Sequence, residues 1–132
     1  MTRERFEALV EEALRTIPQR FRREMKNVAV VVEDEPSDEL LDEMDIPEED
    51  TLFGLYQGTP LPERGWAHGN ALPDRISIYQ FPIEDACETD DDIRACVAET
   101  VIHEFGHYFG MDEDQIEEIE EKYWRGESLD EI

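Results

Sequence analysis

The chain has 132 residues, of which 36 are acidic, 12 are basic and 39% are hydrophobic, and its formal net charge is −24. The length predicts one domain, residues 1–132, with a single modest core. Such a charge repels the phosphates of nucleic acids and an anionic membrane surface, so we expect neither as a partner. The sequence shows no membrane-spanning apolar run and no segment typical of a signal peptide. We therefore expect a cytoplasmic protein, with a monomer as the default oligomeric state.

The first fifty residues predict a helix, a strand and an acidic loop. Apolar residues recur at three- and four-residue steps from Thr2 to Ile17, which predicts a helix, and a short helical turn is expected over residues 18–25. The β-branched run Val28–Glu33 predicts a central strand that is covered on both faces. Asp34 to Asp50 is acidic and predicts a loop with one helical turn at Asp38–Met44.

Two further strands are expected on either side of a long loop. Thr51–Gln57 is a strand candidate, and the alternating segment Arg75–Gln80 predicts a strand with one face buried that ends before Pro82. Residues 59–73 between them are rich in proline and glycine, which predicts an exposed loop of a kind that often carries function.

The last third of the chain predicts two helices. Asp90 to Phe109 is apolar almost all round and follows Thr89, a good N-cap residue, so we expect a buried helix. Gly110 is a natural stop for it, and Asp114–Lys122 predicts a short final helix. Together the elements predict an α+β fold. A small mixed sheet of three to four strands would pack on the N-terminal helix and the buried helix.

Cys87 and Cys96 are the two cysteines of the chain, and their spacing fits no zinc-ribbon pattern. In a cytoplasmic protein such a pair is usually reduced, so we expect two small buried side chains. The alternative is a disulfide that ties the start of the buried helix to the preceding loop.

The buried helix carries a histidine pair with a glutamate between them. His103 and His107 are four residues apart, so their imidazoles project from nearly the same side of the helix, and Glu104 lies about 100° round the axis. This H-E-x-x-H pattern binds zinc through the two histidines and uses the glutamate as a general base on a metal-activated water. Two partly buried histidines bonded to backbone are the structural alternative. This structural alternative explains a single buried histidine more easily than it explains His103, Glu104 and His107 together.

A catalytic zinc takes three protein ligands, so one more ligand must follow the helix. In the extended pattern H-E-x-x-H-x-x-G-x-x-H/D the third ligand comes three residues after the glycine, and here that position is Glu113. A glutamate can bind zinc, although it is one methylene longer than aspartate. The alternative ligands are Asp112, Asp114, Glu117 and His68.

These residues predict a zinc-dependent peptidase. Glu104 would take a proton from water and deliver it to the leaving amine. The oxyanion of the tetrahedral intermediate would need a further donor. Four side chains are candidates for that donor: Tyr56, Tyr79, Tyr108 and His68.

Segments along nearly the whole chain form a recognisable set. They are Ile17-Pro18, Val28–Glu33 with Pro36, Gly54–Gly58, Leu72–Ile76 and Thr100–Gly110. This set resembles the small bacterial zincin-like metallopeptidase family. The resemblance implies a minimal zincin-like fold with an active-site helix beneath the sheet, and a Zn²⁺ cofactor held by the HExxHxxGxx-acid motif. Glu113 stands where the family usually has aspartate.

The resemblance does not identify the peptide or protein substrate. In zincin enzymes an extended substrate pairs with an edge strand above the metal helix, and Leu52–Gln57 is our candidate for that strand. A different class of function is a zincin-like metal-binding or regulatory module with little turnover. A small fold has little room for a deep cleft, and an edge strand can bind a partner without cutting it. A metal-free structural domain is the third interpretation.

Overall fold

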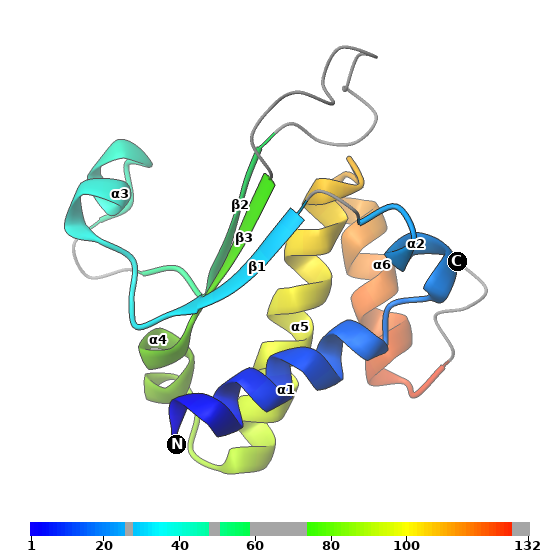
Figure 1. Ribbon diagram of the computed structural model, residues 1–132, viewed down its shortest axis with the longest axis horizontal. Helices are drawn as coiled ribbons and strands as arrows, with labels where there is room; N and C mark the ends of the chain where they lie inside the picture. The colour runs from blue at the N-terminus through cyan, green and yellow to red at the C-terminus, as the bar shows by residue number, and fades with distance from the viewer. Residues whose placement is uncertain (26–27, 48–50, 59–73, 128–132) are drawn as a thin grey trace.

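The computed structural model describes residues 1–25, 28–47, 51–58 and 74–127, which form six helices and a three-stranded sheet (Figure 1). This arrangement confirms the predicted α+β class, with the lower of the two expected strand numbers. The elements in chain order are α1 (Arg3–Arg15), α2 (Gln19–Arg22), β1 (Val28–Glu33), α3 (Asp38–Glu43), β2 (Gly54–Gln57), β3 (Asp74–Tyr79), α4 (Gln80–Asp85), α5 (Asp90–Tyr108) and α6 (Glu113–Trp124). The loop predicted over residues 59–73 lies outside the described residues. Within them, no helix is long and apolar enough to cross a membrane.

The sheet has the order β1-β3-β2, so β3 is its central strand. β3 pairs parallel with β1 and antiparallel with β2. Our prediction of a central strand at Val28–Glu33 is therefore wrong, because that strand lies at an edge and is only partly buried. The prediction that Arg75–Gln80 buries one face is also wrong. Ser77 and Tyr79 are as buried as Ile76 and Ile78, which point to the opposite face.

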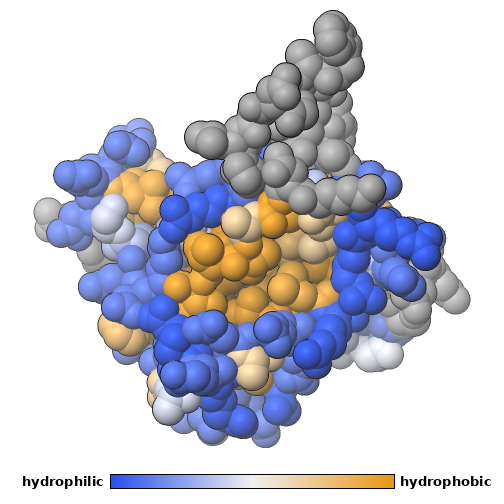
Figure 2. Space-filling model, in the orientation of Figure 1, coloured by the Kyte–Doolittle hydropathy of each residue, from blue (hydrophilic) through white to orange (hydrophobic). Residues whose placement is uncertain are grey.

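β1 contributes its apolar side chains to a hollow on the face seen in Figure 1. Figure 2 shows this hollow as an apolar area surrounded by hydrophilic residues. It has a volume of about 440 Å³ and lies between α1 and β1, where Val10, Leu14, Val30 and Val32 line it. Val28, Val30 and Val32 of β1 are partly buried against the hydrophobic core. This explains why a continuous apolar run can form an edge strand.

α5 is the buried helix of the molecule, and Figure 1 shows it behind α1, with the sheet on one side of it and α6 on the other. Ten of its 19 residues are buried, which confirms the prediction of a helix covered almost all round. The largest fully buried side chains come from α1, β3, α4, α5 and α6, and include Phe6, Ile76, Ile78, Ile83, Tyr108 and Ile116.

The predicted signals mark both ends of α5. Thr89 caps the helix by accepting a hydrogen bond from Asp92 N at 3.1 Å. At the other end Gly110 has a φ of 75°, which disfavours side chains. The N–H groups of Gly110 and Met111 donate to the carbonyls of His107 and Gly106, a Schellman arrangement that turns the chain back.

α6 runs back beside α5 at a very short separation. A Cβ atom added to Gly106 would lie 2.5 Å from Ile116 Cγ1, and Ile116 is 1% exposed. Asp112 and Gln115 form a capping box, which begins α6 one residue before the predicted start. The helix also runs past the predicted end at Lys122 and includes Trp124 in its last turn.

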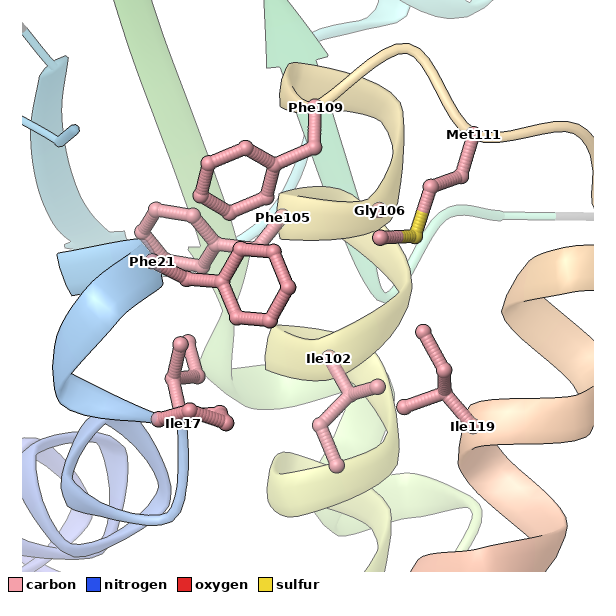
Figure 3. A pocket seen from close by; sticks show the side chains of 9 residues that line it. Ile17, Phe21, Ile102, Phe105, Gly106, Phe109, Met111 and Ile119 are labelled. Carbon is pink, nitrogen blue, oxygen red and sulfur yellow. The ribbon is translucent and has the colours of Figure 1, made fainter. Parts of the chain in front are cut away.

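On another side of α5, a small apolar cavity separates it from α2 and α6 (Figure 3). The cavity measures about 40 Å³, and Figure 3 shows Phe21, Ile102 and Ile119 pointing towards it from three segments. A space of this size is about that of one water molecule, and its lining is apolar. The cavity is therefore a gap between packed helices.

α4 was not predicted from the sequence. Pro82 was expected to end the preceding strand, but it lies in the first turn of α4, where the missing N–H removes no helical hydrogen bond. The buried Gln80 at the start of α4 accepts a hydrogen bond from Arg3 Nε at 2.7 Å and donates to Met1 O at 3.1 Å. These bonds join α4 to the beginning of α1.

Cys87 and Cys96 are free thiols, as predicted, and each packs partly buried against the core. Burial raises the pKa of Cys96 to about 11, so this thiol is neutral at physiological pH. The two cysteines retain some exposure, which differs from the full burial we expected.

The contact between Gly106 and Ile116 leads to a stability prediction. Gly106→Ala adds a methyl group where no space exists, so the free energy of unfolding should fall by about 1–3 kcal/mol despite alanine's better helix propensity. Chemical denaturation measures this change. Ile116→Ala vacates that space, so Gly106→Ala should cost much less in its presence. Equal costs in both backgrounds would show that the contact does not limit how closely α6 approaches.

Candidate metal centre

Two histidines on α5 and a glutamate at the start of α6 converge on one small volume. His103 Nε2 lies 3.6 Å from Glu113 Oε2, and His107 Nε2 lies 3.6 Å from Glu113 Oε1. The imidazole centroids are 4.8 Å apart. The three residues offer ligand atoms that all lie within 4.8 Å of one another, and among the described residues they form a group that could hold a metal ion.

The turn at Gly110 and the cap of α6 explain the position of Glu113. The chain reverses after α5, and Glu113 becomes the first residue of α6, facing back towards the two histidines. The alternative ligands lie differently. The carboxylate of Asp112 accepts the Gln115 N–H at 2.8 Å, whereas Asp114 and Glu117 are exposed and not part of the convergent group. His68 lies outside the described residues.

The ligand atoms lie somewhat farther apart than those around a bound zinc ion, since the group as a whole extends to 4.8 Å. Two ligand atoms at 2.0–2.1 Å from a tetrahedral zinc lie about 3.3 Å apart, close to the 3.6 Å between each Nε2 and Glu113. Two imidazoles and one carboxylate form a donor set of catalytic zinc sites, in which a fourth position stays open. The side chains of His103 and His107 are 34% and 36% exposed, so solvent can reach the volume between them.

Glu104 lies beside the histidines but is buried beneath β2. Its Oε1 atom accepts a hydrogen bond from the backbone N–H of Tyr56 at 3.0 Å. Burial raises the pKa of Glu104, while the neighbouring His103 and the Tyr56 N–H act in the opposite direction. The carboxylate is therefore more basic than an exposed glutamate, which suits a group that must accept a proton.

His107 also has a shifted pKa. Burial and the neighbouring His103 lower the pKa of His107, and the carboxylate of Glu113 opposes them. The imidazole is consequently neutral at pH 7. Only a neutral imidazole has a free lone pair for a metal, so this shift favours metal binding.

The close approach of β2 to α5 depends on Gly54. A Cβ atom at Gly54 would lie 2.7 Å from Thr100 Cγ2 and 3.2 Å from Glu104 Cγ. The strand therefore rests directly on the helix turn that carries Glu104. A glycine inside a strand often marks such an approach, so the sequence held this signal, but it did not reveal the partner.

A cleft of about 850 Å³ opens between β2 and α5. Leu52, Gly54 and Tyr56 line one side, and His103, Glu104 and His107 line the other. Of the three tyrosines predicted as oxyanion donors, Tyr56 reaches the cleft, where its hydroxyl donates to Asp74 Oδ2 at 2.6 Å.

The other two tyrosines face elsewhere. Tyr108 is fully buried, and its hydroxyl donates to Glu24 O at 2.7 Å. Tyr79 is buried too and lines a separate hollow with Arg3 and Glu33.

The structure adds a residue that sequence reasoning missed. Glu120 of α6 places its Oε1 atom 2.9 Å from His103 Nδ1. Burial raises the pKa of Glu120, and its bond to His103 opposes that effect. The spacing from Glu113 to Glu120 could have indicated a shared helix face. The acids at 117, 118 and 121 masked that signal.

The fold and the convergent site agree with a comparison to known families. The sequence model of the zincin-like metallopeptidase family matches residues 25–123, and the chain belongs to this family. Membership implies a metal, usually zinc. The structure is similar to that of a conserved hypothetical protein from Thermus thermophilus, with a TM-score of 0.55 and 28% identity. The similarity covers 83% of this chain and 94% of that one. Among curated proteins, none is significantly similar to the chain.

The raised pKa of Glu104 predicts a pH-dependent effect on stability. The folded state binds the proton of the Glu104 carboxyl more tightly than the unfolded state does. Ionisation of Glu104 therefore destabilises the fold at pH values above the pKa that this carboxyl has in the unfolded chain, and has no such effect below that pKa. Glu104→Gln keeps an oxygen for the Tyr56 N–H but removes the charge. In the presence of a chelator its melting temperature should exceed that of the wild type at pH 7. The difference should shrink as the pH falls towards 4.5, the ordinary glutamate value.

The exposed Glu117→Gln is the matched control, since it removes one charge without relieving a buried group. Thermal unfolding at several pH values gives both differences. An equal rise in the two variants would mean that general charge repulsion, and not the burial of Glu104, causes the effect.

Proposed function

We propose that the protein is a zinc-dependent peptidase. His103, His107 and Glu113 hold the metal, and Glu104 is the general base. The convergence of two Nε2 atoms and a carboxylate beside a buried glutamate carries this proposal. A bound zinc supplies a polarised substrate carbonyl and a water of lowered pKa.

The chain's own groups position Glu104 for proton transfer. Its helix position puts it one residue after His103, and the Tyr56 N–H holds one of its oxygens. From there the carboxylate accepts a proton from the attacking water and passes it to the leaving amine. Because burial raises its pKa, Glu104 gains affinity for that proton.

β2 is suited to bind the substrate. It is an edge strand of the sheet, and it lies along the cleft above the two histidines. An extended peptide could add to this edge as a further strand, with its scissile bond near the metal. Accordingly, the proposed substrate is a peptide or an unfolded protein segment, with no role for nucleic acid or a membrane.

One observation favours the second candidate, a metal-binding protein-interaction module with little turnover. The Tyr56 N–H, which an added strand would use, already donates to Glu104. A peptide that takes over this bond would also release the carboxylate from its partner. Turnover therefore requires that the Glu104 carboxylate stay in position to accept a proton when a peptide is bound. An activity assay decides between the two functions.

Zinc affinity should depend on His103, His107 and Glu113. His103→Ala and His107→Ala should abolish tight binding, and Glu113→Ala should weaken it strongly, because each removes one ligand atom of the convergent group. Competition with a chromophoric chelator measures the dissociation constants. Asp114→Ala and Glu117→Ala, at exposed positions nearby, should bind zinc like the wild type. Wild-type affinity in Glu113→Ala would place the third ligand elsewhere.

The second prediction concerns cleavage. The zinc-loaded protein should cut unfolded casein or a member of a peptide library. Glu104→Gln should lower the rate by about 10²–10⁴-fold while retaining zinc, because it removes the proton acceptor. Mass spectrometry identifies the products. Cleavage that persists unchanged in Glu104→Gln would contradict the mechanism, whereas zinc binding without any cleavage would favour the interaction module.

A further inference from the structure

Glu120 differs from the other acidic residues of its helix. α6, which the structure describes in full, contains six acidic side chains, and five of them are exposed. The side chain of Glu120 is only 15% exposed. Burying a carboxylate is unfavourable unless it gains a hydrogen bond, and Glu120 has one from the ring of His103 at 2.9 Å.

This contact determines which nitrogen of His103 can bind a metal. A carboxylate accepts hydrogen bonds, so the proton of the neutral imidazole lies on Nδ1, the atom facing Glu120. The lone pair then lies on Nε2. That atom points towards Glu113, on the side of the convergent group. The two glutamates therefore address opposite nitrogens of one ring.

The geometry of α6 explains how one helix reaches both nitrogens. Glu113, Ile116 and Glu120 are spaced at i, i+3 and i+7, so they lie on the same face. Ile116 occupies the space that Gly106 leaves on α5. This central contact fixes the height and rotation of α6, and so places a carboxylate on either side of His103.

We propose that Glu120 is a positioning residue for the metal centre, which orients His103 and holds its proton on Nδ1. This inference rests on the proposed role of His103 as a ligand. A carboxylate bonded to a ligating histidine fixes the ring and raises its basicity, and its loss typically lowers metal affinity about 10–100-fold. Glu120 itself does not touch the metal or the substrate.

Zinc affinity is the first test. Glu120→Ala should weaken zinc binding about 10–100-fold in a chelator competition, and Glu120→Gln, which keeps an acceptor oxygen, should fall between it and the wild type. Glu121→Ala is the control, because Glu121 is the next residue and is 60% exposed. It should bind zinc within about twofold of the wild type. Affinity in Glu120→Ala equal to that of the control would overturn the proposal.

The tautomer of His103 is the second test, and it separates positioning from a purely structural role. Long-range ¹H–¹⁵N spectra of the metal-free protein resolve the ring nitrogens, and the chain has only three histidines. The wild type should carry the His103 proton on Nδ1. Glu120→Gln, checked for folding by circular dichroism, should weaken this preference, and Glu120→Ala should weaken it further. A proton on Nε2 in the wild type would overturn the proposal.

Different results would contradict the proposed metal centre and the proposed role of Glu120. If His107→Ala abolishes zinc binding but Glu120→Ala does not weaken it, the metal centre stands and the role of Glu120 falls. If the wild type binds no zinc, the metal centre falls, and the positioning role falls with it. Glu121→Ala and circular dichroism of each variant distinguish both results from unfolding.

Discussion

The structure depends on satisfying polar side chains that lie on a buried helix. α5 is packed between α1, α6 and the sheet, yet it carries two imidazoles and a carboxylate in its last two turns. Such groups destabilise a buried helix unless they find partners. β2 supplies a backbone N–H to Glu104, and α6 supplies carboxylates to His103 and His107. The elements around α5 are thus arranged by its polar residues as well as its apolar ones.

Two glycines let these partners come close enough. Gly54 allows β2 to rest on α5 beside Glu104, and Gly106 allows α6 to approach beside His103. A Cβ atom at either position would lie under 3 Å from a side chain across the contact. Hydrogen bonds tolerate errors of only a few tenths of an ångström, so both contacts affect the hydrogen bonds of Glu104 and His103 although neither glycine bears a functional group.

Sequence patterns within one helix predicted the features of that helix, but they did not predict contacts between segments that are distant in the sequence. The caps at Thr89 and Gly110, the buried α5 and the convergence of His103 and His107 all follow from spacing within one helix. The order of the strands does not, because a β-branched run such as β1 suits an edge strand that packs against the core as well as a strand at the sheet centre. Glu120 was hidden for a similar reason. Its neighbours on α6 are also acidic, and only packing shows which of them turns inward.

Two carboxylates, those of Glu113 and Glu120, lie against the imidazole of His103. Burial is the main cause that raises the pKa of Glu104 and of Glu120, and the charge of Glu113 adds to it in both cases, so Glu113 repels each of these carboxylates in the metal-free protein. A divalent cation within the convergent group would place two positive charges among these carboxylates and lower their mutual repulsion. The same carboxylates that strain the metal-free site would therefore favour the bound cation, and α6, which carries two of them, would be held most firmly when the metal is present.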